Sequence, residues 1–325
     1  MIAYLIRRVL QSVGVLLAVS LVVFLGIYAI GNPAAILLPD DATGAELDAA
    51  IASLGLDRPL PLQYFTFLGN AIRGDLGTSF VFNTPSIELI FARLPATLEL
   101  AITAMLFAVL LGIPLGLWAG LKPGSAFDET VVTGSILGFS MPNFWQGMML
   151  IMIFAVGLGI LPANGRGETG TILGIETSFA TADGIRHLIL PALNLALFKL
   201  ALMIRLTRTG VREVIGLDYV KFARAKGLSE QRVLMVHVLK NILVPIVTIM
   251  GMEFGSLIAF ATITETIFAW PGMGKLLIDS INNLDRPVVV AYVMVVTLMF
   301  VVINLLVDVA YSALDPRVRL GGNAP

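Results

Sequence analysis

The sequence predicts an all-α polytopic membrane protein, built as a single transmembrane domain over residues 1–325. Hydrophobic residues make up 57% of the 325 positions and charged residues only 13%, against roughly 25% charged residues in ordinary soluble domains. Several apolar stretches also reach the length of about 20 residues that a helix needs to cross about 30 Å of hydrocarbon. Most of the chain must therefore face lipid or other buried helices.

Six stretches are predicted to span the membrane. The first carries no charged residue, the fifth is interrupted only by Glu253, and the third is too long for one straight helix. The fourth is the least apolar, because it contains His187, Pro191, Asn194 and Lys199. The predicted spans are 9–30, 98–121, 131–160, 187–207, 242–264 and 287–308.

The distribution of positive charge supports the fourth span and predicts the orientation. With both termini in the cytoplasm, the inside segments (the N-terminus, 122–129, 205–240 and 308–325) hold 13 of the 21 Lys and Arg residues. Cytoplasmic loops of membrane proteins carry an excess of these residues. Without the fourth span, the most basic segment, 205–240, would lie outside, so six spans are the better prediction.

Residues 31–95 form the predicted outer loop. They mix Pro, Gly and Asp with short apolar patches, which predicts a small helical cap on the outer face, too short for a separate domain with a substantial core. A cleaved signal peptide over 1–30 is the alternative for the first span. The apolar run 9–30 is longer than the usual core of 7–15 residues in such peptides, and NPAA at 32–35 is a poor cleavage site.

No catalytic or metal-binding constellation is visible in the sequence. There is no cysteine, and the two histidines, His187 and His237, belong to no HExxH motif. A G-x-S-x-G elbow and the phosphate-binding G-x-x-x-x-G-K-[ST] loop are also missing from the chain. We therefore expect no catalytic residue, no metal and no cofactor on this chain, and an ATP-driven role would require a separate ATPase.

The basic segment 211–240 has the pattern of a helix, a glycine turn and a second helix. The first helix is predicted from about Val211 to Lys226, with Gly227 in the left-handed conformation that often ends helices. Ser229 is a natural N-cap for the second helix. This pattern predicts a short, stiff, basic knob on the cytoplasmic side. A polybasic loop that only binds anionic lipid is the alternative, and the spacing leaves both open.

The same segment resembles the ATPase-docking loop, or EAA loop, of permease subunits in binding-protein-dependent ABC importers. The version of this loop in the dipeptide, oligopeptide and nickel branch is the most similar one, at ARAKGL (223–228) and HVLKN (237–241). Within that branch, the chain resembles the first of the two permeases. Lys221 and Phe222 replace the Glu and first Ala of the broader loop consensus, a departure that the peptide branch shares. Matching fragments elsewhere are YLIRRVLQ at 4–11, GLDRPLPLQY at 55–64, GDLGTSF at 74–80, RLPATLEL at 93–100, SMPNFW at 140–145, TETIFAWPGMGKLL at 264–277 and DVAYSALDPRVRL at 308–320.

The resemblance implies a permease of the bacterial cytoplasmic (inner) membrane that works by alternating access. Its implied partners are a homologous second permease, two ABC ATPases that bind ATP and Mg, a periplasmic or lipid-anchored solute-binding protein and membrane lipid, with no nucleic acid. The implied solute is a di- or oligopeptide or a related small solute. The residues that the resemblance places at the ATPase contact are Tyr219, Ala223, Arg224, Ala225, Lys226, Gly227 and Leu228.

Four residues are candidates for the solute pathway. Pro142 could break the third span and expose Asn143 or Trp145 to a water-filled cavity; a simple packing kink is the alternative. Glu253 lies near the middle of the fifth span, where an isolated charge costs roughly 2.5–3.5 kcal/mol. It must face a cavity or a partner, and its alternatives are a peptide's ammonium, Lys199 or a group on the second permease.

Glu265, Trp270 and Pro271 are candidates for an outer gate, because their segment resembles the family's re-entrant or capping turn. Packing alone would also explain the aromatic residue. For the whole chain, a stand-alone secondary transporter or channel is the alternative function. Such carriers often contain two inverted repeats, and residues 1–160 and 161–325 show no convincing repeat.

Overall fold

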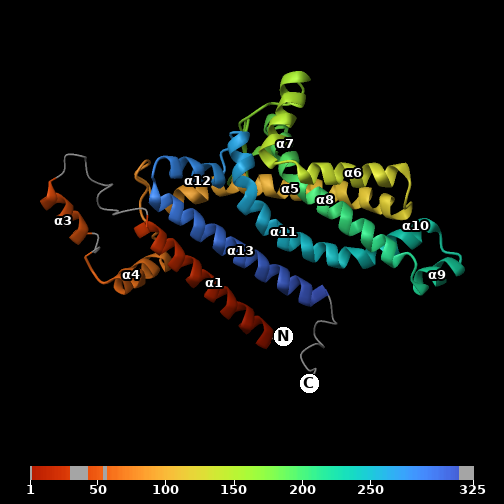
Figure 1. The fold of residues 1–325 in the computed structure, drawn as a ribbon, viewed down its shortest axis with the longest axis horizontal. Coiled ribbons are helices and arrows are strands. Elements are labelled where there is room, and N and C mark those ends of the chain that lie inside the picture. Colours follow the sequence, from red (N-terminus) through yellow and green to blue (C-terminus); the bar gives the residue numbers. More distant parts are fainter. Residues whose placement is uncertain (1, 30–42, 54–56, 315–325) are drawn as a thin grey trace. The chain divides into compact units, whose positions relative to one another are not determined.

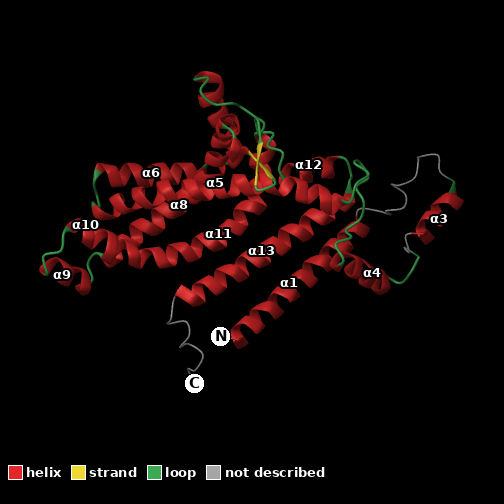
Figure 2. Cartoon of the chain, turned by 180° about the vertical axis from the view of Figure 1, so that it is seen from behind, coloured by secondary structure: helices red, strands yellow, loops and turns green. Residues whose placement is uncertain are grey.

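The computed structural model describes residues 2–29, 43–53 and 57–314, which are mostly helical (Figure 1 and Figure 2). The chain divides into two compact units, residues 1–94 with 276–301 and residues 95–275 with 302–325. The helical, multi-span fold class is confirmed. The prediction of one permease domain over 1–325 stays a prediction.

Short connections join the helices along the chain. The first half contains α1 (Ile2–Ala29), α3 (Gly44–Ser53), α4 (Leu60–Ile72), α5 (Ser86–Leu121), α6 (Ala126–Ser140), α7 (Asn143–Leu150) and the π-helix η1 (Ile151–Gly157). Two short strands, β1 (Gly170–Ile172) and β2 (Ile175–Thr177), form an antiparallel hairpin that the sequence did not predict. The second half contains the 3₁₀ turn η2 (Ser178–Ala180), α8 (Ala182–Val214), α9 (Asp218–Ala225), α10 (Glu230–Arg232), the π-helix η3 (Val233–Leu239), α11 (Lys240–Ile267), α12 (Met273–Asn282) and α13 (Arg286–Leu314).

Five helices of the described chain are long and apolar enough to cross a membrane: α1, α5, α8, α11 and α13. A sixth span results only if α6 is counted together with the helical segment Asn143–Gly157, and these two are bent by 110°. The predicted third span, 131–160, is therefore not one helix. The exact count of six and the orientation stay predictions.

Two helices extend beyond the spans predicted from the sequence. The second span was predicted to begin at residue 98, but α5 begins at Ser86, because the helix continues through Pro95. Membrane helices tolerate such prolines where neighbouring groups satisfy the freed backbone. The fourth span was predicted at 187–207, and α8 extends beyond it at both ends.

In the first unit, α4 packs against α1. The Ser20 and Tyr64 hydroxyls lie 2.9 Å apart, and the Phe24 and Tyr64 rings meet edge to face with centroids 5.5 Å apart. Parts of the predicted outer loop, 31–42 and 54–56, lie outside the described residues, as does the C-terminal segment 315–325. The helices α3 and α4 are consistent with a helical loop, and its role as an outer cap stays a prediction.

In the second unit, α8 lies close to α5, α6 and α11. Three α5 glycines, Gly112, Gly116 and Gly120, face α8 at a spacing of four residues. A Cβ atom on Gly116 would lie 2.6 Å from the Ile204 carbonyl oxygen and 2.7 Å from the Thr207 Cβ. The two backbones therefore approach as closely as in small-xxx-small helix pairs of membrane proteins.

Candidate solute pathway and docking loop

The third predicted span breaks at Met141 and Pro142. Pro142 has no N–H to donate to the helix, and the residue before a proline is pushed towards extended backbone, as Met141 is, with ψ 138°. The buried Gln146 side chain donates hydrogen bonds from Nε2 to the carbonyl oxygens of Gly138 and Met141. The break is therefore a bend of 110° at which the Gln146 side chain satisfies two of the freed carbonyl oxygens.

Beside this break, two amides and a hydroxyl form a small polar cluster. Asn194 of α8 donates from Nδ2 to Asn143 Oδ1 at 2.5 Å and to Thr264 Oγ1 of α11 at 3.0 Å. Asn143 Nδ2 lies 3.5 Å from the same hydroxyl. Asn194 is only 2% exposed, and its Oδ1 has no hydrogen-bond partner among the described residues. The amide cluster Asn143–Asn194–Thr264 thus joins the first turn of α7 to both long helices.

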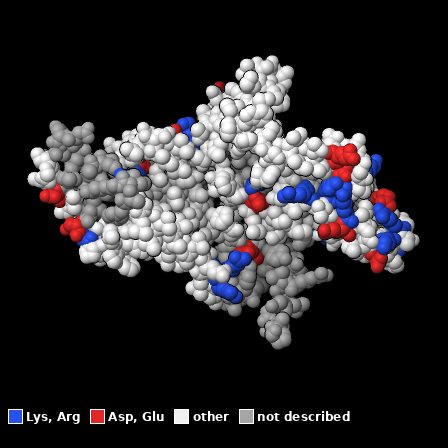
Figure 3. Space-filling view, in the orientation of Figure 1, with Lys and Arg blue, Asp and Glu red and all other residues white. Residues whose placement is uncertain are grey.

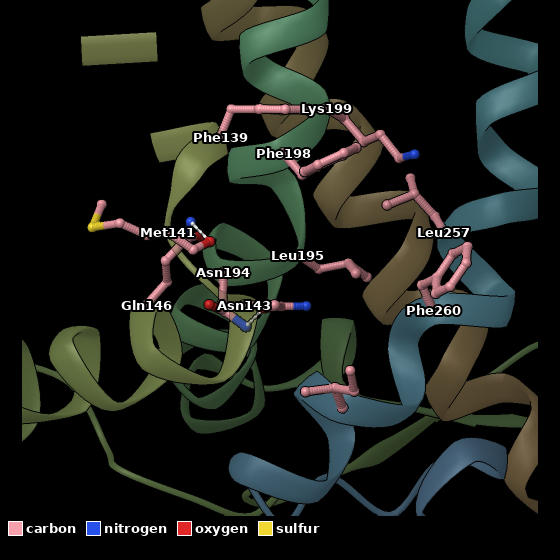
Figure 4. Close-up of a pocket in the computed structure, with 11 residues that line it drawn as sticks. Phe139, Met141, Asn143, Gln146, Asn194, Leu195, Phe198, Lys199, Leu257 and Phe260 are labelled. Atoms are coloured by element: carbon pink, nitrogen blue, oxygen red, sulfur yellow. Dashed lines mark hydrogen bonds between the residues drawn. The ribbon is translucent and has the colours of Figure 1, made fainter. Parts of the chain in front are cut away.

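A cavity of about 350 Å³ opens beside the amide cluster (Figure 4). Its walls come from the end of α6, the start of α7, α8 and α11, and the rings of Phe139 and Phe198 stack with centroids 4.4 Å apart. Of the four predicted pathway residues, only Asn143 is among those that line it. The lining residues are Phe139, Met141, Asn143, Gln146, Asn194, Leu195, Phe198, Lys199, Leu257, Phe260 and Ile263.

Glu253 pairs with Lys199. The Lys199 ammonium donates to Glu253 Oε2 and, at 2.8 Å, to the Ser256 hydroxyl, which also donates to Glu253 Oε2 at 3.1 Å. The Lys199 side chain is 9% exposed and the Glu253 side chain 30%. A charged group in a span requires such a partner. Of the alternatives for Glu253, the structure shows the pair with Lys199. A role for Glu253 in the pathway stays a prediction, as do those of Pro142 and the exposed Trp145.

The predicted outer-gate segment is buried against α5. Thr97 donates to Glu265 Oε1 at 2.7 Å, and the Lys275 backbone N–H donates to Glu265 Oε2 at 2.9 Å. The Trp270 indole N–H donates to the Ala96 carbonyl oxygen at 2.9 Å. Glu265 and Trp270 have no exposed surface, and Pro271 is half-buried. Packing therefore accounts for the aromatic residue, and a gating role for these three residues stays a prediction.

The basic segment differs from its prediction in one respect. A single helix was expected from Val211 to Lys226, but α8 ends at Val214 and α9 starts at Asp218 after a short turn. Gly227 has φ +77°, and the Leu228 N–H donates to the Ala223 carbonyl oxygen at 3.4 Å. The predicted glycine turn is present, since glycine adopts this conformation without strain. Ser229 is the N-cap of α10, as predicted.

Contacts on both sides of Gly227 make the turn compact. The Arg224 guanidinium donates to both Glu230 carboxylate oxygens across the turn, at 2.9 and 3.2 Å. Ala223 is buried in a core with Val220 and Val238, whereas Ala225, Lys226 and Gly227 are exposed and Leu228 is half-buried. The expectation that Ala223 offers a surface to another protein therefore does not fit its burial.

Tyr219 ties α9 to the π-helix η3. Its hydroxyl donates to the His237 carbonyl oxygen at 3.2 Å and accepts from Asn241 Nδ2 at 2.9 Å. Asn241 donates to the same carbonyl oxygen at 2.7 Å. A π-helix leaves the ordinary i→i−4 pattern, and such segments are frequent at functional sites. Figure 3 shows Lys and Arg side chains gathered at the end of this unit that carries α9 and α10.

Two family models match the chain. The model described as "Binding-protein-dependent transport system inner membrane component" matches residues 112–320, and its N-terminal counterpart matches residues 1–101. The chain belongs to this family. It is a multi-pass permease subunit of a binding-protein-dependent importer in the bacterial cytoplasmic membrane, and the family that the sequence resembles is confirmed.

Curated relatives cover almost the whole of this inner membrane component. It is 40% identical over 337 residues to the dipeptide transport system permease protein DppB of Escherichia coli K12, covering 98% of this chain and 99% of the relative. It is 40% identical to the oligopeptide transport system permease protein AppB of Bacillus subtilis, covering 98% and 100%. It is 38% identical to the glutathione transport system permease protein GsiC of Escherichia coli O6:H1, covering 98% and 99%.

A solved structure supports the fold of this membrane component. The inward-facing MetNI methionine ABC transporter matches with a TM-score of 0.52 at 16% identity, over 71% of this chain and 96% of the other. At this identity the likeness concerns the fold alone.

Proposed function

We propose that this chain is one of two permeases of an ATP-driven importer for di- or oligopeptides or a related small solute. The observation that carries the proposal is the likeness to peptide and glutathione permeases, which extends over 98% of the chain at 38–40% identity. A binding protein, periplasmic or lipid-anchored, would deliver the solute. Two separate ABC ATPases would bind ATP and Mg.

In the proposed orientation there are six spans, with both termini, 122–129 and 205–240 in the cytoplasm. The positive charges favour it, since most Lys and Arg residues then lie inside. The bent pair of α6 and Asn143–Gly157 would supply the third span. The loop 31–95, with α3 and α4, would cap the outer face.

The segment 211–240 is the proposed docking loop for an ATPase. Its exposed groups around Gly227 suit such a contact, and the Arg224–Glu230 pair and the Tyr219 hydroxyl hold it together as one piece. ATP can change the conformation of the permease only if the closed ATPases fit one arrangement better than the other. A compact loop transmits that preference to α8 and α11, which flank it in the chain. The proposed contact residues are Tyr219, Arg224, Ala225, Lys226, Gly227 and Leu228, with Ala223 beneath them.

The cavity beside the amide cluster is the proposed part of the solute pathway. Non-helical backbone inside a membrane is tolerated only where it is buried in protein or lines a cavity. The break at Pro142 meets this condition, since Met141 lines the cavity. Glu265, Trp270 and Pro271 would act as a rigid stop on the outer side, and not as a mobile surface.

Reconstitution in proteoliposomes tests this function. Uptake of a labelled dipeptide should require ATP, the second permease, both ATPases and the binding protein together. Gly227→Pro should leave the protein inserted and assembled but abolish ATP-driven uptake, because proline cannot adopt the positive φ of this turn. Uptake by this chain alone would overturn the proposal in favour of a secondary transporter or channel.

A further inference from the structure

The cavity beside the amide cluster has the size of a small ligand site. Its volume of about 350 Å³ lies at the lower end of the roughly 300–1,000 Å³ that ligand pockets occupy. That volume suits a solute of a few residues and not a folded partner. Its walls are mostly apolar, with the amides of Asn143 and Asn194 at one end and Lys199 beside Phe198 at the other, and a few placed polar groups in an apolar wall are usual in a site that orients a ligand.

The polar end is complementary to a peptide bond. Asn194 Oδ1 is an acceptor that no donor among the described residues satisfies, and a buried oxygen without a donor is unfavourable. Asn143 Nδ2 is a donor held only by the long 3.5 Å contact with Thr264. A peptide bond presents one N–H donor, the group that Asn194 Oδ1 lacks, and one carbonyl acceptor, which would give Asn143 Nδ2 a shorter hydrogen bond than its contact with Thr264.

The other end offers aromatic surface. The rings of Phe139 and Phe198 stack, Phe198 is 48% exposed and Phe260 is 67% exposed. The Lys199 ammonium lies 5.3 Å from the Phe198 ring centroid. Figure 4 shows Phe139 and Phe198 towards one end of the cavity, Asn143 and Asn194 towards the other, and Phe260 on a separate wall. An acyl chain of a lipid would suit the rings but would leave the amides unsatisfied.

We propose that this cavity is a selective subsite for short peptides in transit. Phe198 contacts an apolar or aromatic side chain of the solute, and Asn143 and Asn194 bind the adjacent peptide bond. The inference rests on the proposed function and adds to it that the permease itself, and not only its binding protein, discriminates between solutes.

The test compares two peptides in the complete reconstituted transporter with its partner permease, ATPases and binding protein. Initial rates of ATP-driven uptake are measured for labelled Ala-Ala and Ala-Phe, each at a concentration that saturates the binding protein. Phe198→Ala should lower the Ala-Phe rate relative to the Ala-Ala rate by about two- to tenfold, the range that one aromatic contact gives. Asn143→Ala should lower both rates alike, because every peptide contains the bond that it binds.

The matched control is Phe144→Ala. Phe144 is 52% exposed and adjacent to Asn143 but does not line the cavity, so the rate ratio should stay at the wild-type value. If Phe198→Ala does not assemble, Phe198→Leu removes the ring while it keeps apolar volume, and the same ratio is expected to fall.

Three results would overturn the inference. An unchanged ratio in the assembled Phe198 variant would overturn it and leave the proposed function intact. A lipid that co-purifies with the wild-type assembly but not with Phe198→Ala, detected by mass spectrometry, would assign the cavity to an acyl chain. No uptake of either peptide by the wild-type assembly would overturn the proposed function, and the subsite with it.

Discussion

Asp128 in the first turn of α6 is held by Arg208 of α8 through two hydrogen bonds, from Nε to Oδ1 at 2.5 Å and from the guanidinium to Oδ2 at 3.0 Å. Arg212, one turn further along α8, adds a third at 2.7 Å. Asp128 is 2% exposed and also accepts from the Gly124 backbone N–H. This cluster joins the start of the helix that breaks at Pro142 to the helix that precedes the docking loop.

Asp128→Asn should destabilise the protein by about 1.5–3 kcal/mol, because the charged hydrogen bonds of a buried carboxylate to Arg208 and Arg212 are lost. The midpoint of thermal unfolding of the purified protein measures this. Asp218→Asn is the matched control, since Asp218 is exposed and its pair with Lys221 should contribute at most about 1 kcal/mol. Equal midpoints for the two variants would contradict a stabilising role of the cluster.

Gly116→Ala should lower stability by about 1–3 kcal/mol, because the new Cβ would collide with the backbone of α8 at Ile204 and overpacking forces backbone shifts. Gly134→Ala in α6 is the control. No atom lies within 4 Å of a Cβ built there, so this variant should be neutral or slightly more stable. The midpoints of thermal unfolding of the two variants test this prediction. A lower midpoint in both variants would contradict it, because the loss of stability would then not depend on the close contact at Gly116.

Lys199→Met should reduce the yield of folded protein more than the double variant Lys199→Met with Glu253→Met. The single change leaves Glu253 in a span without its cation, whereas replacement of both members of a buried pair by apolar residues is often neutral. Size-exclusion profiles of the solubilised proteins give the comparison. A double variant that behaves no better than Lys199→Met would contradict this explanation and show that the two side chains stabilise the fold through contacts beyond their own pair, such as those with Ser256.

Tyr219→Phe should cost about 1 kcal/mol, since one hydroxyl that serves the His237 carbonyl and Asn241 is lost. Amide hydrogen exchange should speed up in η3 and in the first turn of α11, because the tie to α9 is gone. Tyr64→Phe removes a comparable hydroxyl contact with Ser20 in the other unit and should leave exchange in 233–241 unchanged. Unaltered exchange in Tyr219→Phe would contradict the prediction and show that the Tyr219 hydroxyl does not stabilise η3.

Local signals carried the successful predictions. An apolar run of sufficient length predicts a span whatever it packs against, so the five spanning helices coincide with predicted stretches. The turn at Gly227 was equally predictable from the sequence. A glycine between two helical patterns is typical of a turn with positive φ, and Gly227 has φ +77°.

Contacts between distant residues were beyond these signals. The spacing of Gly112, Gly116 and Gly120 is visible in the sequence, but the face of α8 that fills it is not. Asn143 was a predicted pathway residue because it follows Pro142. Asn194 was noted only as a polar residue in the least apolar span, and its hydrogen bond to Asn143, 51 positions earlier, was not predicted. That Glu265 and Trp270 are buried against α5 was also not predictable, because it depends on hydrogen bonds to Thr97 and to the Ala96 carbonyl oxygen, about 170 positions earlier in the chain.

By itself, the sequence determined a multi-span membrane protein with a glycine-turned basic loop, because hydropathy, charge and single-residue backbone preferences are properties of short stretches. Its assignment as a permease came from the resemblance of whole segments to a known family, which the family models confirm. Only the tertiary structure decided that the third span bends at Pro142, that Lys199 neutralises Glu253, and that amides from α7 and α8 meet beside a cavity. Those outcomes depend on which helix faces come together, and that is a property of the packed helices and of no single segment.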